Sequence, residues 1–185
     1  MITLLALSGS LRLGSSNTVL LEAAALLAPA GMRIAAYDGI GSLPHFNPDL
    51  DGDNPPRSVM ALRHLVGAAD GLIISCPEYA RGIPGSFKNA LDWLVGSSEF
   101  PGKPVALFNA SPRASDAQAA LRLVLTTMSA RIVEEASITL PLLATRLDAV
   151  GMAGDLEIAA SVTAALAAFA RAIETFAQAE PGGSG

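Results

Sequence analysis

The sequence predicts an α/β fold in which a parallel sheet lies between two layers of helices. Apolar runs typical of buried strands alternate with helical patterns, and this alternation is the signature of βαβ units. The chain has 185 residues, of which 51% are hydrophobic and 16% charged, so one domain with a large core is expected. Five strand-like runs favour a three-layer sandwich with the strand order 2-1-3-4-5.

Strands are expected where short apolar runs stand between turn residues. They are placed at Ile2–Leu7, Met32–Tyr37, Gly71–Cys76, Pro104–Asn109 and Arg131–Ala136. Helices are expected where apolar residues recur every three or four positions, as from Leu20 to Leu27. They are placed at Asn17–Leu27, Arg57–Ala68, Gly85–Val95, Asp116–Ser129 and Asp155–Gln178. The stretch from Asp38 to Pro56 is too long for a plain connection.

The same composition bounds the domain organisation and the possible partners. Residues 1–180 are expected to form a single domain, followed by a disordered tail at 181–185. A net charge of −5 argues against a nucleic-acid surface. Gly, Pro or charged residues interrupt the apolar stretches before the ~20 residues that a membrane span needs, so no membrane partner is expected.

Cysteine usage and the first residues predict a cytoplasmic protein. Cys76 is the only cysteine, which excludes an internal disulfide and a Cys-rich metal site. It lies in an expected buried strand, where a free thiol is an inert core residue. The apolar start at Met1 has no basic residues before it, so it is interpreted as the first strand rather than a signal peptide.

The segment between the first strand and the first helix has the residues of a phosphate-binding loop. It reads Ser8-Gly9-Ser10-Leu11-Arg12-Leu13-Gly14-Ser15-Ser16-Asn17. Glycines let the backbone approach an anion, and the serine hydroxyls and the helix N-terminus donate to phosphate oxygens. Arg12 adds a counter-charge with a forked set of donors. The candidate phosphate ligands are Ser10, Arg12, Ser15, Ser16 and Asn17.

Two better-known phosphate motifs are excluded. Gly14 is followed by Ser15 rather than by Lys and Ser or Thr, so this is no P-loop. The glycines at 9 and 14 do not supply the three spaced glycines of a dinucleotide fingerprint. A monophosphate site remains, and the alternative is a well-capped helix with Ser16 or Asn17 as its N-cap.

The segment after the third strand carries the most specific pattern of the chain. It contains Pro77-Glu78-Tyr79-Ala80 and, further on, Pro84 and Lys88-Asn89-Ala90-Leu91-Asp92-Trp93. Together with the phosphate loop, it resembles the NAD(P)H-dependent FMN reductases, a flavodoxin-like family that includes quinone and chromate reductases. Ligands of open α/β sheets lie outside the carboxyl ends of the strands, where both segments are expected.

The resemblance implies an NAD(P)H oxidoreductase that passes electrons through bound FMN to quinones or other small oxidants. Hydride transfer would take place on FMN, so no catalytic side chain is expected. The resemblance places the flavin ring against Pro77, Glu78, Tyr79, Ala80, Arg81 and Ser111. Two positions depart from the family pattern, because Ala80 replaces an Asn and Pro112 removes a backbone donor from a usually Gly-rich turn.

The residues alone leave alternatives open. A flavodoxin-like electron carrier is one, although its usual acidic surface and aromatic flavin flanks are not evident here; a flavin-free scaffold is another. The segment Leu43–Leu50 also resembles the family, in which it reaches the neighbouring subunit, so a homodimer or homotetramer is expected. Trp93 is expected to anchor its helix in the core or at a subunit interface.

Overall fold

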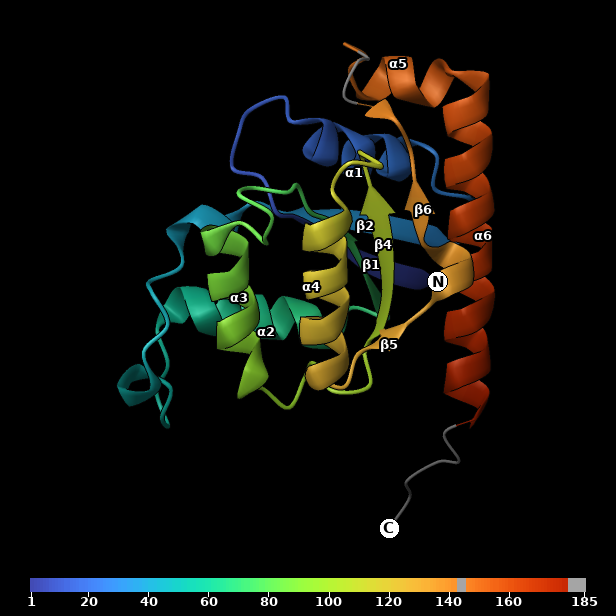
Figure 1. Ribbon diagram of the computed structural model, residues 1–185. Helices are drawn as coiled ribbons and strands as arrows, with labels where there is room; N and C mark the ends of the chain where they lie inside the picture. The colour runs from blue at the N-terminus through green and yellow to red at the C-terminus, as the bar shows by residue number, and fades with distance from the viewer. Residues whose placement is uncertain (143–145, 180–185) are drawn as a thin grey trace.

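The fold is a parallel sheet between two layers of helices, as the computed structural model shows for residues 1–142 and 146–179 (Figure 1). The strands are β1 Ile2–Ser8, β2 Met32–Tyr37, β3 Gly71–Ser75, β4 Pro104–Asn109, β5 Arg131–Ile132 and β6 Ile138–Thr139. Their order is β2-β1-β3-β4-β5 and the pairings are parallel, which confirms the predicted topology. The expected tail at 181–185 lies outside the described residues.

Helices cover both faces of the sheet. They are α1 Ser16–Leu26, α2 Arg57–Ala68, α3 Gly85–Val95, α4 Ser115–Thr127, α5 Ala149–Gly154 and α6 Leu156–Ala179. Side chains along β1 alternate between the two faces, as strand geometry requires. Leu5 and Leu7 belong to the core under α2, α3 and α4, whereas Leu4 and Ala6 belong to the core under α1 and α6.

The fifth strand differs from the prediction, because it is interrupted. Only Arg131–Ile132 form β5, residues Glu134–Ala136 make a 3₁₀ turn, and β6 then pairs with β4 again. At the interruption, the Ser137 hydroxyl accepts the Leu107 N–H at 3.1 Å and donates to the Val133 carbonyl at 2.9 Å. The Ser137 side chain thus takes the place of a backbone acceptor beside β4, and the Leu107 N–H stays hydrogen-bonded where the strand is interrupted.

The C-terminal helices correct two further expectations. Helix α5 was not predicted. Its N-cap is Asp148, whose Oδ1 accepts the Gly151 N–H at 2.7 Å. Helix α6 has 24 residues and contains an 18-residue stretch with a mean hydropathy of 1.6, so by length and composition alone it could cross a membrane. Its Val162, Leu166 and Phe169 are fully buried in the core, as in a core helix of an α/β sandwich.

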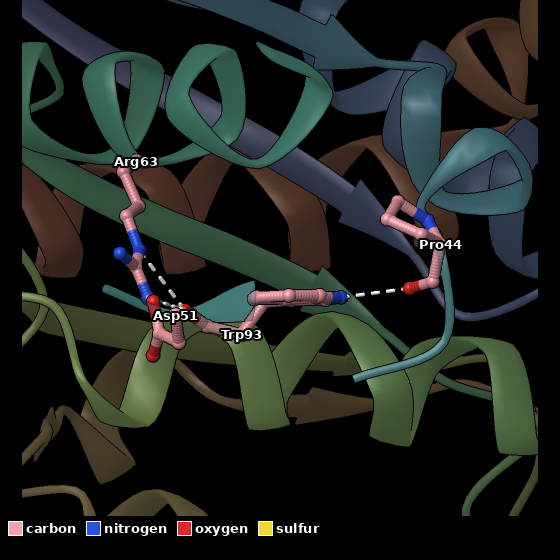
Figure 2. Close-up of polar contacts among 4 residues, drawn as sticks. All are labelled: Pro44, Asp51, Arg63 and Trp93. Atoms are coloured by element: carbon pink, nitrogen blue, oxygen red, sulfur yellow. Dashed lines mark hydrogen bonds and ion pairs between the residues drawn. The ribbon is translucent and has the colours of Figure 1, made fainter. Parts of the chain in front are cut away.

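The long loop after β2 is fastened to α2 and α3 (Figure 2). The Trp93 indole N–H donates to the Pro44 carbonyl at 2.7 Å, and Trp93 is fully buried. Arg63 on α2 donates to the Trp93 carbonyl at 2.6 Å and pairs with Asp51 at 2.7 Å. Trp93 is therefore the core anchor of α3, which was one of the two alternatives for this residue.

Candidate functional site

Three loops meet at the carboxyl edge of the sheet, where β1, β3 and β4 lie side by side. Each strand of this trio ends in a polar loop, and each loop leads into a helix, α1, α3 or α4. Since β1 is paired with β2 on one side and β3 on the other, the chain reverses its winding direction at β1. Ligand sites of open α/β sheets lie at such switch points.

Gly9 brings the first two loops into contact. Its N–H donates to the Ser75 carbonyl at 2.8 Å. A Cβ at this position would lie 2.9 Å from Cys76 Sγ and 3.2 Å from Pro77 Cδ. Only glycine permits this approach of the β1 loop to the β3 loop, and the approach places the candidate phosphate loop beside the Pro77 segment.

Polar side chains of the β1–α1 loop are oriented as donors, because their oxygens already accept hydrogen bonds inside the protein. Ser10 Oγ accepts the Arg12 N–H at 3.3 Å, and Ser15 Oγ accepts the Asn17 N–H at 3.2 Å. Asn17 Oδ1 accepts from the Ser75 hydroxyl at 3.0 Å. The hydroxyl hydrogens and the Asn17 amide hydrogens are left to donate. This set of donors suits an anion.

The charge balance of the loop points the same way. Ser15 is the N-cap of α1, so the alternative N-caps Ser16 and Asn17 were wrong by one or two positions. The first turn of α1 has no acidic residue, so its positive end is not neutralised there. Arg12 is exposed and is the one charged side chain between Ser8 and Thr18.

The three loops enclose a cavity of about 320 Å³. It is lined by nine of the predicted site residues: Ser10, Arg12, Ser15, Ser16, Asn17, Pro77, Glu78, Tyr79 and Ser111. Ala80 and Arg81 are not on its wall. Cys76, Asn109, Arg113 and Ala114 also line it. Asn109 closes its end of the cavity by accepting the Ser111 N–H through Oδ1 at 3.1 Å.

Cys76 lies at the cavity wall but is fully buried, and burial raises the pKa of its thiol to about 12. Since the thiolate is the reactive form, the native protein is expected to resist thiol-specific alkylation at pH 8. Denatured protein should react within minutes, which provides the control. Rapid stoichiometric labelling of the native protein, measured by intact mass, would contradict this prediction.

Glu78 joins the β3 loop to α4. Its Oε2 accepts the backbone N–H groups of Asp116 and Ala117, each at 3.0 Å. Helix α4 has Ala114 as its N-cap, and this residue offers no capping side chain. Glu78 therefore caps α4 from a different loop, and its negative charge lies at the positive end of the helix. It holds the second and third loops of the cavity together.

A Glu78→Ala substitution is expected to lower the free energy of unfolding by about 1–2 kcal/mol, because it leaves two N–H groups of α4 without their acceptor. Glu78→Gln is the matched variant, since its amide oxygen still accepts. Denaturant unfolding followed by circular dichroism measures both. Equal stability of Glu78→Ala and the unmodified protein would rule out the capping role.

The tip of the β3 loop is a strained two-residue turn. Ala80 and Arg81 have positive φ angles of 49° and 62°. The residues on either side of them exchange backbone hydrogen bonds. The Tyr79 N–H donates to the Gly82 carbonyl at 3.1 Å, and the Gly82 N–H donates to the Tyr79 carbonyl at 3.0 Å. Turns with positive φ at both central residues favour Asn and Gly. The exposed pair of Arg81 with Asp116, at 2.9 Å, connects this turn to α4.

Ala80→Gly and Ala80→Asn are expected to raise the free energy of unfolding by about 0.5–1 kcal/mol, because a left-handed conformation costs an alanine about 1–2 kcal/mol. The contrasting variant is Ala164→Gly in the exposed part of α6, where the same change should destabilise by about 0.5–1 kcal/mol. If both Gly variants destabilised the protein alike in chemical unfolding, the turn would not be strained.

The fold and the site define a class. This is a doubly wound α/β protein with a donor-rich loop, which is not a P-loop, at the switch point of its sheet. The chain belongs to the NADPH-dependent FMN reductase family, whose sequence model matches residues 2–142.

Similar proteins agree with this assignment. The chain is 41% identical over 112 residues to the NAD(P)H-dependent FMN reductase PA1204 of Pseudomonas aeruginosa, and 38% identical over 108 residues to a quinone reductase of Escherichia coli K12. These alignments cover 60% and 57% of each chain, so the match spans less than two thirds of those relatives. The solved structure of FerB, a flavoenzyme NAD(P)H:(acceptor) oxidoreductase from Paracoccus denitrificans, has a TM-score of 0.84 and 31% identity. That comparison covers 95% of this chain and 99% of FerB.

Proposed function

We propose that the protein is an FMN-dependent NAD(P)H oxidoreductase that passes electrons to quinones or other small oxidants. The observation that carries the proposal is the donor-rich loop at the N-terminus of α1, set at one end of a cavity between three strand-end loops. Membership of the NADPH-dependent FMN reductase family supports the same cofactor and reductant. The activities for which PA1204, the E. coli quinone reductase and FerB are named support the substrates.

The residues present fit FMN. The phosphate would lie against Ser10, Arg12, Ser15, Ser16 and Asn17, where donors outnumber acceptors. The ring end would lie between Pro77, Tyr79 and Ser111 on the cavity wall. Tyr79 is 53% exposed, so its ring is available to pack against a planar ligand. Arg113 adds a second cation, whereas the Glu78 carboxylate is neutralised in part by the α4 N-terminus.

Bound FMN would supply the redox chemistry, accepting a hydride from NAD(P)H and passing two electrons to a quinone, which takes up one proton that derives from the hydride and one from water. The protein's own contribution is binding and orientation. Glu78 holds the β3 and β4 loops at a fixed separation. Gly9 keeps the phosphate loop against Pro77. No side chain is assigned as a general acid or base, because hydride transfer requires alignment of donor and acceptor rather than proton transfer by the protein.

The test is to purify the protein and to measure flavin and activity together. The expected result is a yellow protein that releases FMN on denaturation and oxidises NAD(P)H with a benzoquinone as acceptor, with ping-pong kinetics. A yellow protein that reduces no quinone but exchanges electrons with another protein would be an electron carrier. A protein that binds no FMN at micromolar concentration would overturn the proposal.

We further infer a homodimer or homotetramer in the cytoplasm. Tyr79 at the cavity wall and Leu50 in the long loop after β2 are 53% and 47% exposed, and exposed apolar side chains near a site mark contact surfaces. A free cysteine is compatible with the reducing cytoplasm. Size-exclusion chromatography with light scattering tests the assembly, and a monomer that retains FMN and activity would contradict it.

A further inference from the structure

A second hollow lies beside the phosphate loop, on the side away from the FMN cavity. It is a groove of about 350 Å³ between α1 and the carboxyl ends of β1 and β2. Ala6, in the core under α1, and Ala36, its register partner on β2, line it, and their small side chains on this face of the sheet leave the space open. Ser10 and Arg12 line both the groove and the FMN cavity, so the two hollows meet at the phosphate loop.

Polar groups of the groove are suited to hydroxyls. Asp38 follows the last residue of β2, and Glu22 lies on α1; both carboxylates are exposed at the groove. Carboxylates accept hydrogen bonds from a vicinal diol. Leu11 and Leu13 line the same groove, are 57% and 95% exposed, and provide apolar contact for a planar base.

The position of Asp38 in the sheet has a general precedent. In doubly wound nucleotide-binding sheets, a carboxylate after the strand that neighbours the first strand accepts from a ribose hydroxyl. Here β2 is paired with β1 along its length, from Ile2 with Met32 to Leu7 with Tyr37. Asp38 therefore stands at the equivalent edge, one strand away from the phosphate loop.

We propose that this groove binds the adenosine half of the nicotinamide dinucleotide, with Asp38 accepting from the ribose hydroxyls and the pyrophosphate lying along the exposed β1–α1 loop. The assignment rests on the proposed reductase function, since the nicotinamide must reach the FMN cavity. The 2′-phosphate of NADPH would lie near the Asp38 and Glu22 carboxylates, so the protein is expected to favour NADH.

The experiment titrates ADP-ribose into FMN-loaded protein by calorimetry. ADP-ribose has no nicotinamide, so binding is read without turnover. Asp38→Asn removes the charge at an exposed position, and Ala36→Phe fills the groove from an exposed position of β2. Asp53→Asn, on the exposed part of the long loop, is the matched control for charge. The KM values for NADH, NADPH and quinone are measured in the same variants.

The dissociation constant of ADP-ribose and the KM for NADH are expected to rise about fivefold in Asp38→Asn, because a neutral acceptor replaces a charged one. Ala36→Phe should raise both by about tenfold or more, whereas Asp53→Asn should leave both within about twofold. FMN affinity and the KM for quinone should be unchanged in every variant. The preference of the unmodified protein for NADH should decrease in Asp38→Asn.

Two results would overturn the assignment. One is an unmodified protein that does not bind ADP-ribose at millimolar concentration. The other result is that the Ala36→Phe and Asp38→Asn variants both bind ADP-ribose as tightly as Asp53→Asn does. That result would mean that the adenosine binds elsewhere. If ADP-ribose binds as expected but neither dinucleotide is oxidised, the groove assignment stands and the proposed reductase function fails.

Discussion

Substitution of Trp93 by alanine is expected to lower the free energy of unfolding by about 3–5 kcal/mol, the usual cost of removing a fully buried aromatic side chain. Trp93 is completely buried, and the Phe46 ring packs edge-on against it with 5.0 Å between centroids. Its indole N–H also holds the Pro44 carbonyl. The variant therefore loses both core packing and the attachment of the long loop to α3.

The measurement is chemical unfolding followed by circular dichroism, because Trp93 is the only tryptophan and its removal abolishes the fluorescence signal. Trp93→Phe keeps a ring in the core and loses the indole donor, so its expected loss is smaller, about 1–2 kcal/mol. Leu13→Ala, at a side chain that is 95% exposed, should change stability by less than about 0.5 kcal/mol. A Trp93→Ala variant as stable as Leu13→Ala would show that the loop and α3 are not held by this residue.

The sheet was predictable because its inner strands are continuous apolar runs. Strands β1, β3 and β4 are buried on both faces, which makes their middle segments, Leu4–Leu7, Leu72–Ile74 and Val105–Phe108, continuously apolar. The fifth strand was not predictable, because its pairing passes through the Ser137 hydroxyl rather than through the backbone. Helix α5 was missed for a different reason, since Gly151 and Gly154 within six residues give a weak helical signal.

The candidate site was predictable where it depends on local sequence. The β1–α1 loop needs glycine, hydroxyl and cation within ten residues, and these can be read directly. The role of Glu78 could not be read, because its partners Asp116 and Ala117 are 38 and 39 residues away. The positive φ angles at Ala80 and Arg81 were equally hidden, since neither residue type favours that conformation.

The strain at Ala80 changes how its departure from the family pattern is understood. The resemblance places the flavin ring against Ala80, which replaces an Asn, and Ala80 is not among the residues that line the cavity. An Asn at this position would satisfy the left-handed backbone conformation of the turn. The departure thus affects the stability of the loop tip, and through Arg81 and Asp116 its attachment to α4.

Replacement of Arg12 by alanine is expected to weaken FMN binding by about 1.5–3 kcal/mol, which is roughly 10- to 150-fold in the dissociation constant. Arg12 is the one cation of the phosphate loop, and nothing acidic in the first turn of α1 competes for it. Its backbone N–H is held by Ser10 Oγ, so removal of the side chain should leave the loop conformation unchanged. The loss is therefore expected to be one of charge alone.

Riboflavin separates this effect from damage to the cavity, because it has the ring of FMN without the phosphate. Arg12→Ala should leave riboflavin affinity within about twofold while FMN affinity falls, as fluorescence titration measures. The control variant is Arg33→Ala, which removes the same charge at an exposed position near the amino end of β2, at the opposite edge of the sheet. It should leave the affinities for FMN and for riboflavin unchanged. Raising the salt concentration should weaken FMN binding to the unmodified protein more than to Arg12→Ala. Equal affinity of the unmodified protein for FMN and riboflavin would mean that the donors at the N-terminus of α1 hold no phosphate.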